Sequence, residues 1–149
     1  MGFRFERRSE RVEDAKISDY LALNEAMTEF IAYRVRRYYY LEKGLDNDVA
    51  QERADLGAYT VEFGLLHRVL QKYKQLGHDE KMLMVDIQRG YFLGDMLPLK
   101  KLQIVHPDAV KLLRDMKPGD IDSIISTAKS FGLGEYAEYL EEMAKTSKK

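Results

Sequence analysis

The pattern of apolar and polar positions predicts helices along most of the chain. The first predicted helix spans about 19–43, where apolar residues recur at intervals of three and four, the spacing that places side chains on one helix face. This apolar stripe consists of Leu23, Met27, Phe30, Ile31, Val35 and Tyr38. Ser18 or Asp19 is a suitable cap for its start, and Gly44 marks its end. We therefore expect one long amphipathic helix here.

Further helical segments follow, separated by residues that are typical of turns. The predicted segments are 48–76, with Gly57 as a candidate break, and then 78–90, 98–105, 107–116, 121–131 and 134–145. Residues 91–95, Tyr-Phe-Leu-Gly-Asp, are predicted to form a turn with aromatic anchors. No stretch shows the strict alternation of a half-buried strand. The sequence therefore predicts an all-α fold, an irregular bundle of six or seven helices.

The first 19 residues differ from the rest, because they mix acidic and basic residues with few apolar ones. We interpret residues 1–19 as an N-terminal arm and residues 20–149 as a single helical domain. A chain of 149 residues is of the usual size for one domain and is long enough to bury a core.

Composition excludes several classes of function. The net charge of −1 gives no general attraction to nucleic acid or to acidic membranes. The absence of cysteine excludes disulfides, a thiolate nucleophile and a cysteine-ligated metal. No apolar run approaches the ~20 residues that a membrane helix needs, and the start lacks the apolar region of a signal peptide. We therefore expect a soluble, cytoplasmic protein without membrane association.

Two acidic residues of the first helix stand one turn apart. Glu25 and Glu29 are spaced i,i+4, and like charges at this spacing destabilise a bare helix by a few tenths of a kcal/mol. A metal, a cation or a hydrogen-bond donor between them would remove that cost. The alternative is a solvated acidic face, eased by Arg36 two turns beyond Glu29. The spacing alone leaves both interpretations open.

The identity of the neighbouring residues adds a resemblance to a known family. Residues 24–29, Asn-Glu-Ala-Met-Thr-Glu, resemble the Asn-Glu-x-x-Ser/Thr-Asp/Glu helix of the gluzincin metallopeptidases, the thermolysin-like superfamily, and are most similar to the small minigluzincins. Residues 59–62, Tyr-Thr-Val-Glu, and residues 91–95, followed by Leu99 and Leu102, resemble later segments of the same proteins. The resemblance covers roughly residues 20–104, which it relates to the C-terminal helical subdomain of gluzincins. Residues 105–149 would be additional helices.

The resemblance implies roles for four residues. Glu25 corresponds to the third zinc ligand. Asn24 and Glu29 lie in the second shell, where the acid orients a zinc-bound histidine. Tyr59 corresponds to a tyrosine whose hydroxyl would reach the substrate.

One departure from the family pattern limits this expectation. Gluzincins carry a His-Glu-x-x-His helix upstream, which supplies two zinc ligands and the general base. This sequence contains no such motif: its histidines are His67, His78 and His106, and no histidine precedes Glu25. A catalytic zinc site needs three protein ligands, an open water position and a base. Zinc is thus implied by the resemblance but not expected in this chain alone.

Two functions remain open from the sequence. The first is an incomplete or degenerate metallopeptidase-like domain that keeps the Glu25 helix and is not catalytic alone. The second is a non-catalytic helical protein-interaction module with no metal. In the first case we expect a groove beside Glu25 and Glu29, filled by a protein partner, by residues 1–19 or by a second copy of the chain. The sequence indicates no substrate.

Nucleic-acid binding is not favoured. Residues 33–40, Tyr-Arg-Val-Arg-Arg-Tyr-Tyr-Tyr, mix basic and aromatic side chains as single-strand binders do. On a helix, however, these side chains point all round the axis and form no single patch. The sequence also contains no glycine-rich phosphate loop. We assign no nucleic-acid-binding residue.

Overall fold

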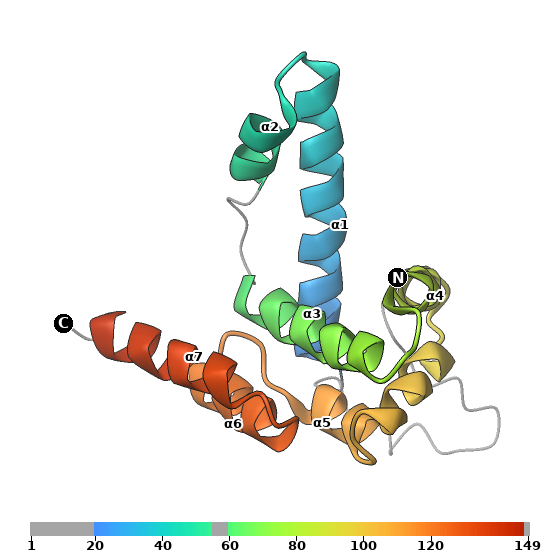
Figure 1. Cartoon of the computed structure of the whole chain (residues 1–149), viewed down its shortest axis with the longest axis vertical. Helices are drawn as coiled ribbons and strands as arrows, with labels where there is room; N and C mark the ends of the chain where they lie inside the picture. Colours follow the sequence, from blue (N-terminus) through green and yellow to red (C-terminus); the bar gives the residue numbers. More distant parts are fainter. Residues whose placement is uncertain (1–19, 55–59, 148–149) are drawn as a thin grey trace.

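The computed structural model describes residues 20–54 and 60–147. Within these two ranges the chain forms seven α-helices and one 3-10 helix and no β-strand (Figure 1). The elements are α1 (Leu21–Glu42), α2 (Asn47–Ala54), α3 (Thr60–Gln75), α4 (Glu80–Leu93), η2 (Leu97–Ile104), α5 (Ala109–Asp115), α6 (Ile121–Ser130) and α7 (Gly134–Ser147). The all-α prediction is confirmed. Three predictions lie outside the described residues: the arm over 1–19, Ser18 or Asp19 as the cap of the first helix, and the candidate break at Gly57.

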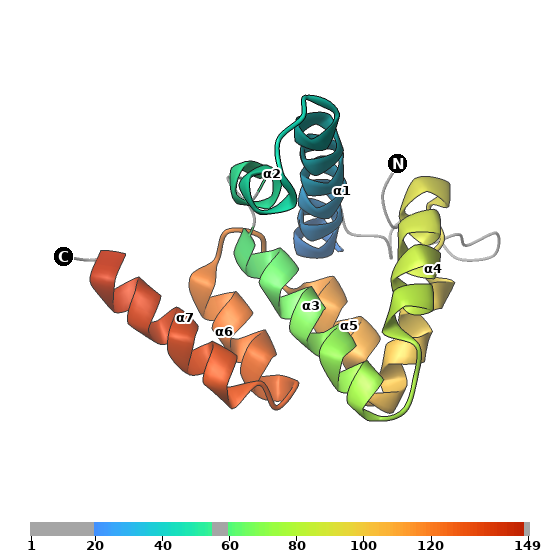
Figure 2. The ribbon, with the colours of Figure 1, turned by 45° about the horizontal axis from the view of Figure 1, so that its top comes forward.

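The helices are arranged as a body with one long projection. In Figure 1, α1 stands upright, its lower half enters the body formed by α3 to α7, and its upper half rises out of that body beside α2. Figure 2 shows the same separation from a second angle, with α6 and α7 side by side. The first predicted segment therefore spans two different environments.

The body holds one hydrophobic core. Tyr20, which immediately precedes α1, is fully buried, as are Leu23 and Met27 in the first two turns of the helix. They belong to a cluster that draws large apolar side chains from the later helices, including Leu66, Leu83, Leu102, Leu113, Ile124 and Leu140. The helices after residue 104 thus share a core with those before it.

Tyr20 fixes the lower end of α1. It has φ 61°, the left-handed conformation that residues other than glycine rarely adopt. Its N–H donates to the carbonyl oxygen of Arg114 at 3.0 Å, and its hydroxyl donates to Sδ of Met96 at 3.1 Å. Because such a conformation costs about 1–3 kcal/mol, it persists only where the surroundings hold it, as α5 and the lead-in to η2 do here.

The predicted helix is present as α1, but its apolar stripe is buried only in the first half. Val35 and Tyr38 are 63% and 66% exposed. The stripe continues in the sequence, but the helix has by then passed the edge of the body (Figure 1). Periodicity locates a face; it does not show whether another element lies against it.

The helical segment predicted at 48–76 corresponds to α2 and α3, and its candidate break at Gly57 lies outside the described residues. The predicted turn at 91–95 is wrong, because α4 continues to Leu93 and ends at Gly94, with φ 71°. Gly90 lies inside the helix, where a Cβ would come 2.3 Å from the carbonyl oxygen of Asp95. That glycine allows the chain to fold back closely and does not stop the helix.

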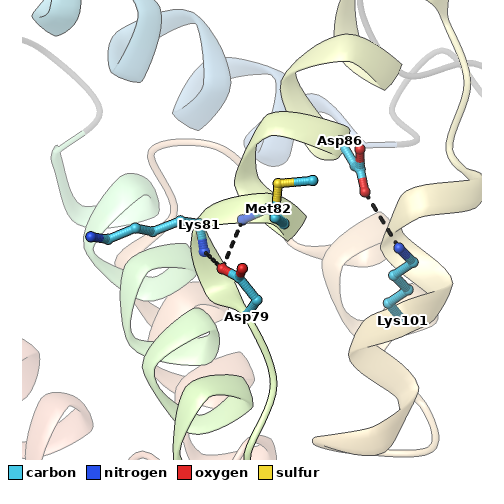
Figure 3. A network of polar contacts seen from close by, with 5 residues as sticks. All are labelled: Asp79, Lys81, Met82, Asp86 and Lys101. Atoms are coloured by element: carbon cyan, nitrogen blue, oxygen red, sulfur yellow. Dashed lines mark hydrogen bonds and ion pairs between the residues drawn. The ribbon is translucent and has the colours of Figure 1, made fainter.

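Polar contacts cap the start of α4 and connect this helix to η2. Asp79 caps α4, accepting hydrogen bonds from the N–H groups of Lys81 and Met82 at 3.1 Å (Figure 3). Lys101 of η2 reaches Asp86 of α4 at 3.3 Å.

The start of α5 differs from its prediction. Asp108 occupies the cap position without a side-chain cap, so Pro107 precedes the cap and is not the first helical residue. Nδ1 of His106 accepts the Asp108 N–H at 3.0 Å instead.

Candidate functional site

Glu25 lies on the lower half of α1, between the buried residues Leu23 and Met27. Its side chain is half-buried. It forms no hydrogen bond or ion pair with any residue in the described ranges. A half-buried carboxylate without such a partner is suited to accept a ligand from outside these ranges, but one carboxylate cannot hold a metal by itself.

Glu29 has a different environment. It is only 9% exposed, so the interpretation of a solvated acidic face does not hold for this residue. Nη2 of Arg36 donates to Oε1 of Glu29 in an ion pair, which confirms the contact expected from the sequence. A role in orienting a histidine would therefore use Oε2 or displace Arg36.

Thr28 connects two segments of the family resemblance. Its hydroxyl donates to the carbonyl oxygen of Asn24 at 2.8 Å, and its Oγ1 lies 2.8 Å from Oη of Tyr91. A threonine hydroxyl has one proton, so the Tyr91 hydroxyl is the donor in the second bond. Tyr91 is buried. The structure thus brings the Asn24–Glu29 segment and the Tyr91–Asp95 segment together across 63 residues of sequence.

The third segment of the resemblance is described only in part. Tyr59, the predicted catalytic residue, lies outside the described residues. Glu62 is 2% exposed, and its Oε1 accepts the Gly119 N–H at 2.8 Å. A buried carboxylate needs such a partner, because its desolvation is otherwise costly. Glu62 therefore has a structural role, joining the first turn of α3 to the turn that precedes α6.

A second polar joint beside Glu62 was not predicted from the sequence. The Tyr136 hydroxyl donates to the carbonyl oxygen of Val61 at 2.7 Å, and the guanidinium of Arg68 lies 3.9 Å above the Tyr136 ring. Burial raises the pKa of Tyr136 to about 12, against an opposing effect of Arg68. A Cβ at Gly64 would come 2.5 Å from the Tyr136 hydroxyl. A glycine inside a predicted helix signals such close approach, and this signal was overlooked.

The residues that could ligate a metal do not gather in the described part of the chain. No group of three or more His, Asp or Glu side chains lies close enough there to hold an ion. His67 is exposed beside the Phe63 ring, and the His78 ring stacks on Tyr73 at 4.8 Å between centroids. His106 is occupied by the backbone of Asp108. These residues alone do not fit a zinc site.

Three cavities formed by described residues lie away from Glu25. The first, of about 390 Å³, lies between α3 and the turn joining α6 to α7. The second, of about 310 Å³, lies between α4 and η2, and the third, of about 290 Å³, between α5 and α6. The predicted groove beside Glu25 and Glu29 stays a prediction.

Comparisons with protein-family models, with curated proteins and with solved structures found no match to this chain. Among the described helices, none is both long and apolar enough to cross a membrane.

Proposed function

We propose that this chain is the glutamate-ligand half of a gluzincin-like zinc site, inactive alone and completed by a His-Glu-x-x-His helix from upstream sequence or from another chain. The observation that carries the proposal is the contrast within one motif. Thr28 and Glu29 have partners within the described chain, while the half-buried Glu25 has none there. Glu25 is the residue that corresponds to the zinc ligand in the family resemblance.

The Thr28–Tyr91 hydrogen bond supports the same proposal. It joins two of the three sequence segments that resemble gluzincins. Segments that act together in a common architecture are expected to lie together in space. In this scheme Glu25 is a ligand, and the second oxygen of Glu29 accepts the free N–H of a ligating histidine. Zinc, when bound, would supply Lewis-acid activation of a water molecule.

The test is zinc binding in two steps. The chain alone should hold no stoichiometric zinc after dialysis, because two ligand positions are missing. In the presence of a segment carrying His-Glu-x-x-His, supplied upstream or in trans, we expect about one zinc per chain. Glu25→Gln should abolish tight binding, and Glu29→Gln should weaken it by roughly 10–100-fold.

Glu42→Gln is the matched control. Glu42 is an exposed acid at the opposite end of α1, so the same charge change there should leave zinc affinity unaltered. Equal affinities for the wild type and Glu25→Gln would overturn the proposal. Stoichiometric zinc on the chain alone would equally contradict it.

A second function, a non-catalytic helical interaction module, is favoured by a separate observation. On α1, Tyr38 and Tyr39 are 66% and 54% exposed, and on α4, Phe92 and Leu93 are 51% and 67% exposed. Large exposed apolar surfaces are typical of interaction sites. If this function holds and the partner is a second copy, the chain should dimerise with rising concentration, as measured by sedimentation. Tyr38→Ser should then weaken the dimer without unfolding the monomer.

A further inference from the structure

The 390 Å³ cavity is lined on one side by a basic face of α3. Arg68, Gln71, Lys72 and Gln75 are spaced i, i+3, i+4 and i+7, so they share that face. Arg68 and Lys72 are like charges one turn apart. Glu62, the acid of this helix, lies in the first turn, where it is bonded to Gly119. The helix itself therefore offers no counter-charge to the two cations.

These two cations also have no acidic partner elsewhere in the described ranges. The ion pairs there use other basic side chains, namely Arg36, Lys74, Lys101, Arg114, Lys129 and Lys145. Arg68 is held in place by its position over the Tyr136 ring and by a hydrogen bond to the carbonyl oxygen of Gly64 at 3.2 Å. A guanidinium that is fixed in this way, but not neutralised, is preorganised to bind an anion.

The other wall of the cavity is the turn Gly132–Leu133–Gly134. A Cβ at Gly132 would lie 3.1 Å from Nζ of Lys72, and Gly132 has φ 72°. Glycine at this position therefore lets the ammonium group approach the turn. No atom outside the immediate chain lies within 4 Å of a Cβ built at Gly134, so the backbone there is accessible.

We propose that this cavity binds the phosphate group of a small phosphate monoester. Arg68 and Lys72 would neutralise the dianion, and the volume of about 390 Å³ leaves room for an organic portion next to Gln71 and Gln75. First-turn N–H groups of α7 add donors, because Leu133 precedes the helix and has no side-chain oxygen to cap them. The cavity and the two cations carry the proposal. It is independent of the zinc proposal above.

The experiment is an amide-resolved NMR titration of the full chain. The probes are inorganic phosphate, glycerol phosphate and a nucleoside monophosphate, each compared with sodium chloride at equal ionic strength. We expect saturable shifts at the amides of Gly132 and Gly134. If the natural ligand is a monoester, the organic probes should bind more tightly than inorganic phosphate. Equal affinities would limit the site to the free anion and overturn the monoester proposal.

Three variants sharpen the test. Lys72→Gln removes one charge-assisted contact and should weaken binding by about 10-fold. Glu135→Gln should strengthen binding, because Glu135 is the acidic side chain that lines the cavity. Lys81→Gln, at an exposed position of α4 that does not line the cavity, makes the same charge change and should have no effect. Absence of saturation at millimolar phosphate, or equal losses in Lys72→Gln and Lys81→Gln, would overturn the proposal.

Discussion

The two halves of α1 carry similar apolar residues in very different surroundings. In the lower half, Leu23 and Met27 are fully buried among the helices of the body. In the upper half, Val35 and Tyr38 continue the same spacing but are mostly exposed, and α2 is the neighbouring helix (Figure 1). A helix of 22 residues is about 33 Å long, and only its lower half enters the body (Figure 1).

This difference separates two uses of one amphipathic pattern. The lower half stabilises the fold and presents Glu25. The upper half contributes little to the shared core, and the rings of Tyr38 and Tyr39 are mostly exposed. Glu29 stands at the boundary, where its ion pair with Arg36 connects the two halves. Stability should therefore be concentrated in the lower half of α1.

Core truncations should give the largest contrast between the halves. Leu23→Ala removes a fully buried side chain and should lower the free energy of unfolding by about 2–5 kcal/mol. Val35→Ala, on the projecting half, should change it by no more than about 0.5 kcal/mol. Urea denaturation followed by circular dichroism measures both values. Equal losses at the two positions would show that the upper half is also packed in solution.

Removing the Tyr91 hydroxyl, which contacts Thr28 in the lower half of α1, should give a smaller effect. Tyr91→Phe leaves the ring but removes the donor to Thr28, which should lower the free energy of unfolding by about 1 kcal/mol. Tyr39→Phe is the matched control on the upper half, where the ring is 54% exposed, and should be neutral. The double variant Thr28→Val/Tyr91→Phe measures the coupling between the two hydroxyls. A coupling near zero would show that the bond between the two motif segments contributes nothing.

Elements defined by local signals were the ones that the sequence predicted well. The helices predicted at 121–131 and 134–145 and the break between them follow from residues adjacent in the chain, and α6 and α7 occur at these positions. The exposure of Val35 and Tyr38 does not follow from periodicity, because it depends on where the body ends. Gly90 was misinterpreted as a stop, because its requirement for space comes from Asp95 after the chain has turned back.

In the candidate site, too, contacts within one helix could be predicted from the sequence, while contacts between distant segments could not. Motif spacing indicated Glu25 and Glu29 and correctly connected Arg36 to Glu29. It gave no sign that Thr28 would meet Tyr91 or that Glu62 would bind Gly119, because those pairs are 63 and 57 residues apart. The cavity beside Arg68 was also missed, since its two walls come from α3 and from the turn before α7.

The last effect is specific to high pH and concerns Tyr136 in the body. Burial raises the pKa of its phenol from 10.0 to about 12, so folding favours the neutral hydroxyl that donates to Val61. This contribution to stability is complete below pH 10 and is lost as the pH rises through about 12. Tyr136→Phe lacks the titrating group, while the other tyrosines are common to both proteins. The advantage of the wild type over Tyr136→Phe in free energy of unfolding should therefore shrink steadily between pH 10 and pH 12, as measured by urea denaturation at each pH. A constant difference across this range would mean that burial does not raise the pKa of the Tyr136 phenol in the folded protein.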